Sequence, residues 1–287
     1  MPSINTSLPL HLIHGLLSSP QEFGLIGNSL RRDGVDHHAL RVPGYTLAHE
    51  TRSHDWRTWR DNALNAIEAA APRGPVVLGG LCMGGVLAAA AALEMRERVA
   101  GLVLISPTFT YDGWGLPPLC RLRPIGYWTG LDRFISIRER HPYGVKSPKV
   151  RKWIEHELEQ RANSAAGPAR MSLRALREGE RMMRHVRTRL AELDCPVLVM
   201  HAREDEITRI ESVQALYDAL PAQDKEFAVL ENSYHMVTID NDRYEVAALL
   251  SRFVARLSGS PVVAADDPMT AHRAAAPAAA SHPAYSR

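Results

Sequence analysis

The feature that most constrains this chain is the turn GLCMGG at positions 80–85, which separates an apolar run from an alanine-rich segment. A Gly-x-nucleophile-x-Gly sequence between a strand and a helix is typical of a nucleophile elbow, here with Cys82 in place of the more usual serine. Gly80 and Gly84 would let strand and helix approach each other without a Cβ clash. The helix after the turn, predicted over Gly84–Arg98, would point its amino terminus at Cys82 and so stabilise a thiolate.

Short apolar runs that end at glycine or polar residues recur along the chain, and segments with helical patterns lie between them. Most of the runs are apolar on both faces, which is typical of the central strands of a parallel sheet. The predicted strands are Leu8–Ile13, His38–Val42, Pro75–Leu78, Gly101–Ile105, Pro196–Met200 and Phe227–Leu230. The other predicted helices are Trp56–Ala71, Glu211–Leu220 and Arg243–Leu257. This alternation predicts an α/β fold with a doubly wound, mainly parallel sheet.

Two segments interrupt the alternation. Residues 108–190 form an insertion before the strand that would carry the acid, with loops rich in Pro, Gly and aromatic residues over Tyr111–Trp128 and helices over Lys149–Arg161 and Met171–Leu190. We expect this 108–190 insertion to be a helical cap or lid over a core made of residues 1–107 and 191–257. Residues 258–287 are rich in Ala, Pro and Ser without periodicity, which predicts a disordered tail.

Partners for Cys82 follow later strands in the order nucleophile, acid, histidine. Asp205 lies in AREDE after the strand at Pro196–Met200, and His235 lies in ENSYH after the last strand. A neutral His235 could take the thiol proton, and Asp205 would orient the ring. Glu204 and Glu206 are rival acids from the same loop.

An oxyanion hole on such a site needs two backbone N–H groups. One would come from Met83, directly after the nucleophile, and the other from the loop HGLL at positions 14–17, where we expect Leu16 to donate. His14 is expected to support that loop by hydrogen bonding.

Composition excludes several other kinds of protein. The formal net charge of +2 gives no indication of nucleic-acid binding, and three scattered cysteines cannot form a disulfide framework or a zinc site. No apolar run is long enough to span a bilayer, and the first fifteen residues lack the pattern of a signal peptide. We therefore expect a cytoplasmic protein without a zinc site.

Four segments carry a resemblance to a known group. They are LHLIHGLLSSP at positions 10–20, the elbow itself, PVLVMHAREDE at 196–206 and NSYHMVTID at 232–240. In these segments the chain resembles the bacterial carboxylesterase and monoacylglycerol-lipase group of α/β-hydrolases. The resemblance extends over about residues 8–257 and is weakest in the insertion. It implies a hydrolase core, a small cap, an acyl-binding pocket and a triad at Cys82, Asp205 and His235. It also implies that the protein uses no metal and no organic cofactor.

The nucleophile departs from that group, in which serine is usual. On this fold a cysteine is also found in dienelactone hydrolases, in polyhydroxyalkanoate synthases and in acyl shuttles. A laboratory substitution of a natural serine by cysteine at position 82 would also produce this sequence. A thiolate exchanges with a thioester at nearly equal energy, whereas a tetrahedral intermediate from an oxygen ester expels the thiolate more readily than the alkoxide. A cysteine nucleophile therefore favours thioester donors.

The insertion is also basic, with 17 Lys and Arg against 8 Asp and Glu over residues 108–190. Arg174, Arg177, Arg181 and Arg184 recur at helical spacing. Such a surface could steer an anionic donor, for example coenzyme A or an acidic acyl carrier protein, or it could be an ordinary solvated helix face.

The prediction for function is a hydrolase that cleaves a small carboxylic ester or thioester through an acyl-Cys82 intermediate. An acyltransferase that uses the same intermediate is the first alternative. A non-catalytic binding protein on the hydrolase fold is the second, and the presence of all three triad positions argues against it.

Overall fold

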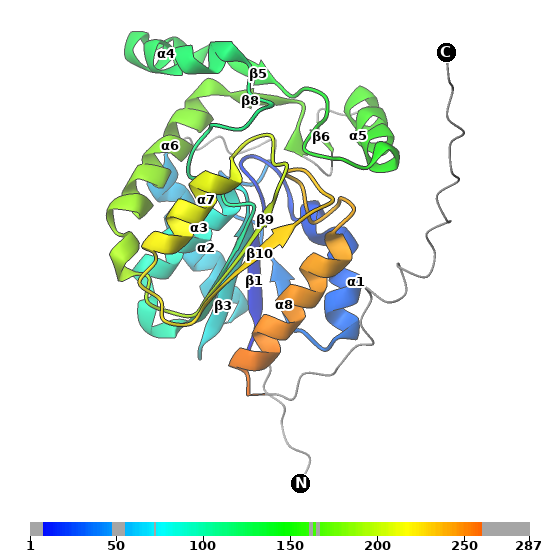
Figure 1. The fold of residues 1–287 in the computed structure, drawn as a ribbon. Helices are drawn as coiled ribbons and strands as arrows, with labels where there is room; N and C mark the ends of the chain where they lie inside the picture. The colour runs from blue at the N-terminus through cyan, green and yellow to red at the C-terminus, as the bar shows by residue number, and fades with distance from the viewer. Residues whose placement is uncertain (1–7, 48–54, 72, 161–162, 165–166, 260–287) are drawn as a thin grey trace, which may run out of the picture.

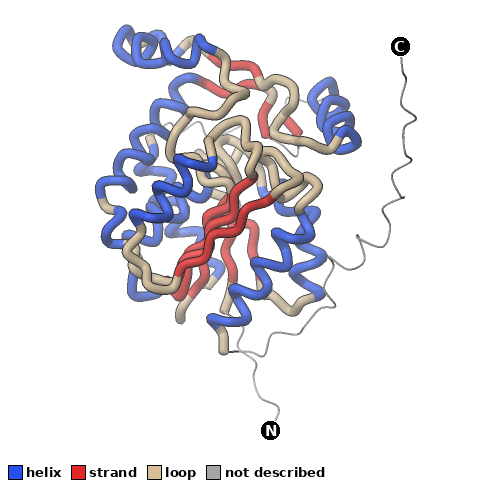
Figure 2. Tube along the Cα trace, in the orientation of Figure 1, coloured by secondary structure: helices blue, strands red, loops and turns tan. Residues whose placement is uncertain are grey.

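The centre of the molecule is a six-stranded sheet. The structure, a computed structural model, describes residues 8–47, 55–71, 73–160, 163–164 and 167–259. The strand order is β10-β9-β4-β3-β1-β2, and every neighbouring pair runs parallel (Figures 1 and 2). The strands are β1 (Leu10–Ile13), β2 (His37–Ala39), β3 (Val76–Leu81), β4 (Val99–Ile105), β9 (Val197–Ala202) and β10 (Lys225–Leu230). The predicted α/β fold with a mainly parallel sheet is therefore confirmed.

Helices cover both faces of the sheet (Figure 1). α1 (Gly24–Arg32) and α8 (Arg243–Leu257) pack on one face, while α2 (Trp56–Ala70), α3 (Met83–Glu94) and α7 (Ile210–Ala219) pack on the other. Neighbouring residues of one strand enter opposite cores, as Val77 and Leu78 do on β3. Because both faces are buried, the strands have the continuous apolar runs from which we predicted them.

We did not predict α1 from the sequence. Its two glycines and its run of Asn, Ser and Arg weaken an apolar pattern that rests on Ile26 and Leu30. Burial of these two side chains against α8 supplies the stability that local propensity does not.

β3 is longer than predicted, because it continues through Gly79 and Gly80 to Leu81. Glycine was expected to end the strand, but here it serves close packing. A Cβ on Gly79 would lie 3.0 Å from the Cβ of Val103, and one on Gly80 would lie 2.2 Å from the carbonyl carbon of Gly84. The strand thus delivers its last residue directly to the turn that holds Cys82.

The 108–190 insertion lies mainly above the carboxyl ends of the strands (Figure 1). It contains α4 (Arg123–Thr129), α5 (Pro148–Gln160), α6 (Leu173–Thr188), the antiparallel pair β5 (Ser136–Arg138) and β8 (Arg170–Ser172), and the short pair β6 (Asn163–Ser164) and β7 (Gly167–Pro168). The expectation of loops alone over Tyr111–Trp128 is wrong, because a 3-10 turn at Pro118–Leu122 leads into α4. α6 packs beside α2 and α3 as well as under α4.

Division into a core and a cap remains a prediction. The tail predicted to be disordered lies outside the described residues from position 260 onward. Within the described part of the chain, no helix is both long and apolar enough to span a membrane.

The contact between α3 and the end of β1 gives a stability prediction. In Gly84→Ala the new Cβ would lie 2.1 Å from the carbonyl oxygen of Ile13 and 2.3 Å from that of His14, so backbone must move. We expect the free energy of unfolding, measured with urea, to fall by about 3 kcal/mol or more. Gly24→Ala is the control, because no atom lies within 4 Å of its new Cβ and the residue is helical. Equal stability of the two variants would contradict the argument.

Candidate active site

Cys82 occupies a strained turn between β3 and α3. Its backbone has φ 57° and ψ −125°, a conformation that non-glycine residues rarely adopt. The turn is fixed by the Cys82 N–H, which donates to the carbonyl oxygen of Ile105 at 2.9 Å, and by the Cys82 carbonyl, which accepts from the N–H of Gly85 at 3.1 Å. Met83 is the first residue of α3, so its N–H has no partner inside the helix.

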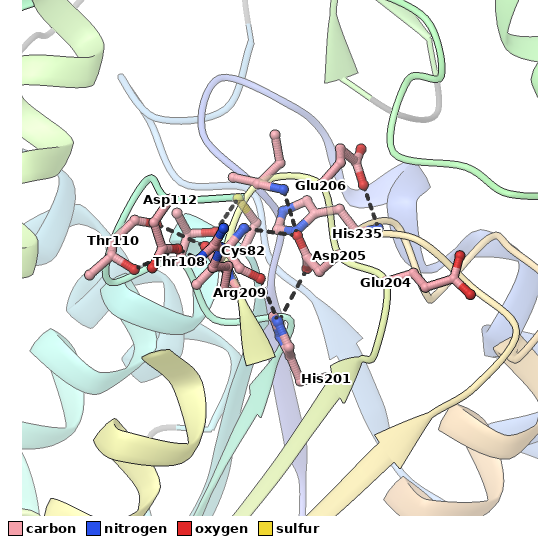
Figure 3. A network of polar contacts seen from close by, with 12 residues as sticks. Cys82, Thr108, Thr110, Asp112, His201, Glu204, Asp205, Glu206, Arg209 and His235 are labelled. Atoms are coloured by element: carbon pink, nitrogen blue, oxygen red, sulfur yellow. Dashed lines mark hydrogen bonds and ion pairs between the residues drawn. The ribbon is translucent and has the colours of Figure 1, made fainter. Parts of the chain in front are cut away.

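Asp205 and His235 are brought together from the loops that follow β9 and β10 (Figure 3). Nδ1 of His235 donates to Oδ2 of Asp205 at 2.7 Å, and both side chains are buried. The other carboxylate oxygen of Asp205 accepts from the N–H groups of Ile207 and Thr208 at 2.8 and 3.0 Å. These bonds fix the carboxylate, which in turn fixes the tautomer and orientation of the imidazole.

The charges of this pair support each other. Burial alone lowers the pKa of His235, but the negative charges of Asp205 and Cys82 outweigh it and place that pKa well above its ordinary value. Burial alone raises the pKa of Asp205, but the charge and hydrogen bond of His235 hold it below its ordinary value. His235 is therefore stabilised as an imidazolium beside a carboxylate, the state reached after it removes a proton from a nucleophile.

The neighbouring carboxyls take different positions. Glu204 points away from the site in Figure 3 and pairs with Lys146 at 3.0 Å. Glu206 is buried and accepts the backbone N–H of His235 at 3.1 Å. Burial raises the pKa of Glu206 to about 7. Of the three acids in this loop, Asp205 is the one whose carboxylate contacts the imidazole ring.

Cys82 and His235 line one cavity of about 210 Å³. Sγ of Cys82 lies 3.3 Å from Oγ1 of the buried Thr108. Nε2 of His235 is buried, and Cys82 is among the groups that raise the pKa of the ring. The cavity also contains Leu16 and Met83, and its outer wall comes from the 108–190 insertion, including Cys120.

The loop at positions 14–17 lies beside the nucleophile, since a Cβ on Gly15 would be 3.7 Å from the Cβ of Cys82. The Gly15 N–H donates to Oε2 of Glu22 at 2.7 Å, so it is not free for a ligand. In the described chain, the amides of Leu16 and Leu17 make no hydrogen bond, and of these two residues Leu16 lines the cavity.

His14 holds this loop from behind. It is fully buried, its Nδ1 lies 2.8 Å from the carbonyl oxygen of Gly15, and its Nε2 lies 2.7 Å from Oγ1 of Thr46. Burial lowers the pKa of His14 to about 4, so the ring is neutral near neutral pH. The geometry gives His14 the supporting position that the sequence suggested.

Sequence reasoning missed two polar residues of the site, Glu22 and Thr108. It named Glu206 only as a rival acid and did not predict that this side chain is buried. Glu22 follows the SSP segment and could have been found as an acid next to a loop with unpaired N–H groups. Thr108 has no local signal, because its contact with Cys82 depends on the pairing of β3 with β4. Burial raises the pKa of Glu22 to about 7.

Metal-binding clusters are absent from the described residues, in which no three His, Cys, Asp or Glu side chains are arranged to hold an ion.

The amino-acid sequence matches a known family of proteins. Residues 7–242 fit the family model described as serine aminopeptidase, S33. The chain belongs to this family. It is an α/β-hydrolase enzyme, and its mainly parallel sheet with flanking helices matches the fold of solved hydrolases.

Curated relatives of this hydrolase include a carboxylesterase of Bacillus subtilis (strain 168), 23% identical over 86% of this chain and 92% of the relative. A thermostable monoacylglycerol lipase of Bacillus sp. (strain H-257) is 21% identical over 86% of this chain and 90% of the relative. Among solved structures, the monoacylglycerol lipase of Paleococcus ferrophilus has a TM-score of 0.70 at 19% identity, covering 88% of this chain and 94% of its own.

Removing the acid should change the histidine. In Asp205→Asn, the pKa of His235 should fall below that of the wild-type protein, because the largest opposing charge is lost while burial remains. The ring protons of His235 in an NMR pH titration measure this directly. Glu204→Gln, which removes an exposed charge of the same loop, should leave the titration unchanged. An unaltered His235 titration in Asp205→Asn would show that the pair is not electrostatically coupled.

Glu206 should make stability depend on pH. Its folded pKa of about 7 lies above the ordinary value of 4.5, so its contribution is fully present below pH 4.5 and is lost as pH rises through 7. Glu206→Gln keeps an acceptor for the His235 N–H without the charge. We expect it to be more stable than wild type by ~1–3 kcal/mol at pH 8 and about equal at pH 4.5, by urea unfolding. A variant that is less stable at pH 8 would refute this.

Proposed function

We propose that this hydrolase cleaves carboxylic esters or thioesters through a covalent acyl-Cys82 intermediate. The observation that carries the proposal is the strained Cys82 at the start of α3, which lines one cavity with His235, the partner of the buried Asp205. The activities named for the carboxylesterase and monoacylglycerol-lipase relatives support an acyl ester as the substrate class. We propose no metal or organic cofactor for this chemistry.

The proposed reaction begins with transfer of the Cys82 thiol proton to Nε2 of His235. The thiolate attacks the acyl carbonyl carbon, and the carbonyl oxygen becomes an oxyanion held by the N–H groups of Leu16 and Met83. Collapse of this intermediate breaks the bond to the alkoxide or thiolate leaving group, which takes the proton from His235. Asp205 stabilises the imidazolium while it exists.

Water then completes the cycle. It gives a proton to His235 as its oxygen attacks the acyl-Cys82 thioester, and the C–S bond breaks to release the carboxylic acid and restore the thiol. If an amine, an alcohol or a second thiol takes the place of water, the same steps describe an acyltransferase. Thioester donors such as acyl-coenzyme A suit a thiolate nucleophile, because both leaving groups of the intermediate are then thiolates.

The proposal predicts an acyl adduct on Cys82. The protein is mixed with a short acyl-coenzyme A or a p-nitrophenyl ester, and intact mass and peptide mapping follow the adduct and the free acid. Release of free acid supports hydrolysis, while an adduct that persists until an acceptor is added supports acyl transfer. Cys82→Ser should lower the ratio of thioester to ester kcat/KM by about tenfold, or ~1.4 kcal/mol of activation free energy.

Cys120 provides the matched control, since it lines the same cavity. Cys120→Ala should form the adduct normally, whereas Cys82→Ala should form none and lose turnover while it keeps its unfolding temperature. Turnover that survives in Cys82→Ala, or an adduct that maps to Cys120, would refute the assignment of the nucleophile.

A further inference from the structure

An unusual row of apolar side chains runs along the outer part of the 108–190 insertion. Six large apolar residues, each between 50% and 88% exposed, recur at every third position. They are Leu119, Leu122, Ile125, Trp128, Leu131 and Phe134, and we call them the apolar stripe. Large exposed apolar patches on proteins of this kind usually mark an interaction surface.

Local structure explains why these residues form one stripe. The segment consists of a 3-10 turn at Pro118–Leu122, the helix α4 and a second 3-10 turn at Leu131–Arg133. In a 3-10 turn residues three apart lie directly above one another, and in an α-helix they are neighbours on one side. Spacing by three through this segment therefore keeps the apolar side chains together.

Polar contacts hold the opposite side of the segment on α6. Nε of Arg123 and the hydroxyl of Tyr127 both donate to Oε1 of Glu180 at 2.9 Å. Arg177 of α6 donates to Oδ2 of the buried Asp132 at 3.2 Å. The segment thus turns polar groups inward and its large apolar groups outward, the reverse of a helix that packs on a core.

Unpaired positive charge borders the apolar stripe. Arg121 and Arg133 lie within its span. Arg138 and Arg140 follow it in the sequence and line the cavity that contains Cys82. None of the four has an ion-pair partner in the part of the chain that the structure describes. Two acids fall in this stretch of sequence. Asp132 pairs with Arg177, and Glu139 has no ion pair in the described part of the chain. The surface therefore combines exposed apolar groups with a net positive charge.

The stripe also lies next to the entrance of the candidate active site. Leu116, Pro117 and Cys120, at its amino-terminal end, line the cavity that contains Cys82. In Figure 1, α4 lies at the outer edge of the molecule, on the far side of the insertion from the sheet. A partner that covers the stripe would therefore lie beside the cavity.

We propose that the apolar stripe and its arginines dock this protein on a membrane surface that contains anionic lipids. Exposed Trp and Phe flanked by arginine have the composition of an interfacial anchor, which inserts its apolar side among the lipid head groups. The stripe runs along a protruding segment, and a deformable lipid surface fits such a shape. A two-fold interface would pack the stripe of one copy against the stripe of the other and so bring like positive charges close together. Docking of this kind does not rest on the proposed acyl chemistry.

Vesicle flotation tests the docking without any turnover. The full chain is mixed with vesicles of phosphatidylcholine alone, or with vesicles in which about a third of the lipid is phosphatidylglycerol. We expect binding to the anionic vesicles that weakens in high salt. The double variant Trp128→Ser, Phe134→Ser should bind about tenfold more weakly. In the double variant Arg121→Gln, Arg133→Gln, the affinity for anionic vesicles at low salt should fall about fivefold for each arginine removed.

Matched controls replace exposed residues elsewhere in the fold. Tyr244→Ser on α8 and Leu25→Ser on α1 remove exposed apolar groups, and Arg32→Gln removes an exposed charge. All three should bind like wild type. An unchanged unfolding temperature in every variant shows that loss of binding is not loss of folding.

The proposal fails if wild type does not bind the anionic vesicles, or if the stripe variants bind as well as wild type. It also fails if sedimentation shows a dimer that the Trp128→Ser, Phe134→Ser variant abolishes while vesicles bind nothing, because the stripe is then an interface between copies. Binding of an acidic acyl carrier protein without binding of vesicles would likewise assign the surface to a protein partner.

Discussion

The site depends first on the close contact of β1, β3 and α3 at Gly80 and Gly84. No side chain larger than hydrogen fits there, because a Cβ on either residue would lie 2.1–2.2 Å from main-chain atoms. This contact brings the loop after β1 next to the turn that holds Cys82. Backbone strain at Cys82 is maintained by the surrounding packing, and residues of two separate segments, Leu16 and Met83, line one cavity.

The buried acids around His235 have opposite pKa shifts, although burial by itself raises the pKa of each. Asp205 faces the imidazole and two backbone N–H groups, so its pKa is lowered despite burial. Glu22 and Glu206 each accept a backbone N–H but have no cation of comparable effect, and burial raises the pKa of both to about 7. One charged carboxylate is thus assigned to the ring, while the other two fix the loops that carry Gly15 and His235.

The sequence was sufficient where the signal is local. The continuous apolar runs predicted the parallel sheet. The elbow and the polar residues after the later strands selected Cys82, Asp205 and His235, which the structure places in one region. It was insufficient where tertiary contacts decide. The stability of α1 comes from α8, the extension of β3 through its glycines comes from Val103 and Gly84, and Thr108 reaches Cys82 only through strand pairing. The length of α4 was hidden by Pro, Gly and aromatic residues.

The cavity has walls of two different origins. Cys82 and His235 stand on turns that follow strands of the rigid sheet, whereas much of the outer wall is built from the 108–190 insertion. Exchange of the insertion's side chains would reshape what the cavity accepts and leave the reacting groups in register. In the proposed reaction, substrate choice and bond-breaking chemistry are therefore separable, so that one can diverge through evolution or engineering while the other is preserved.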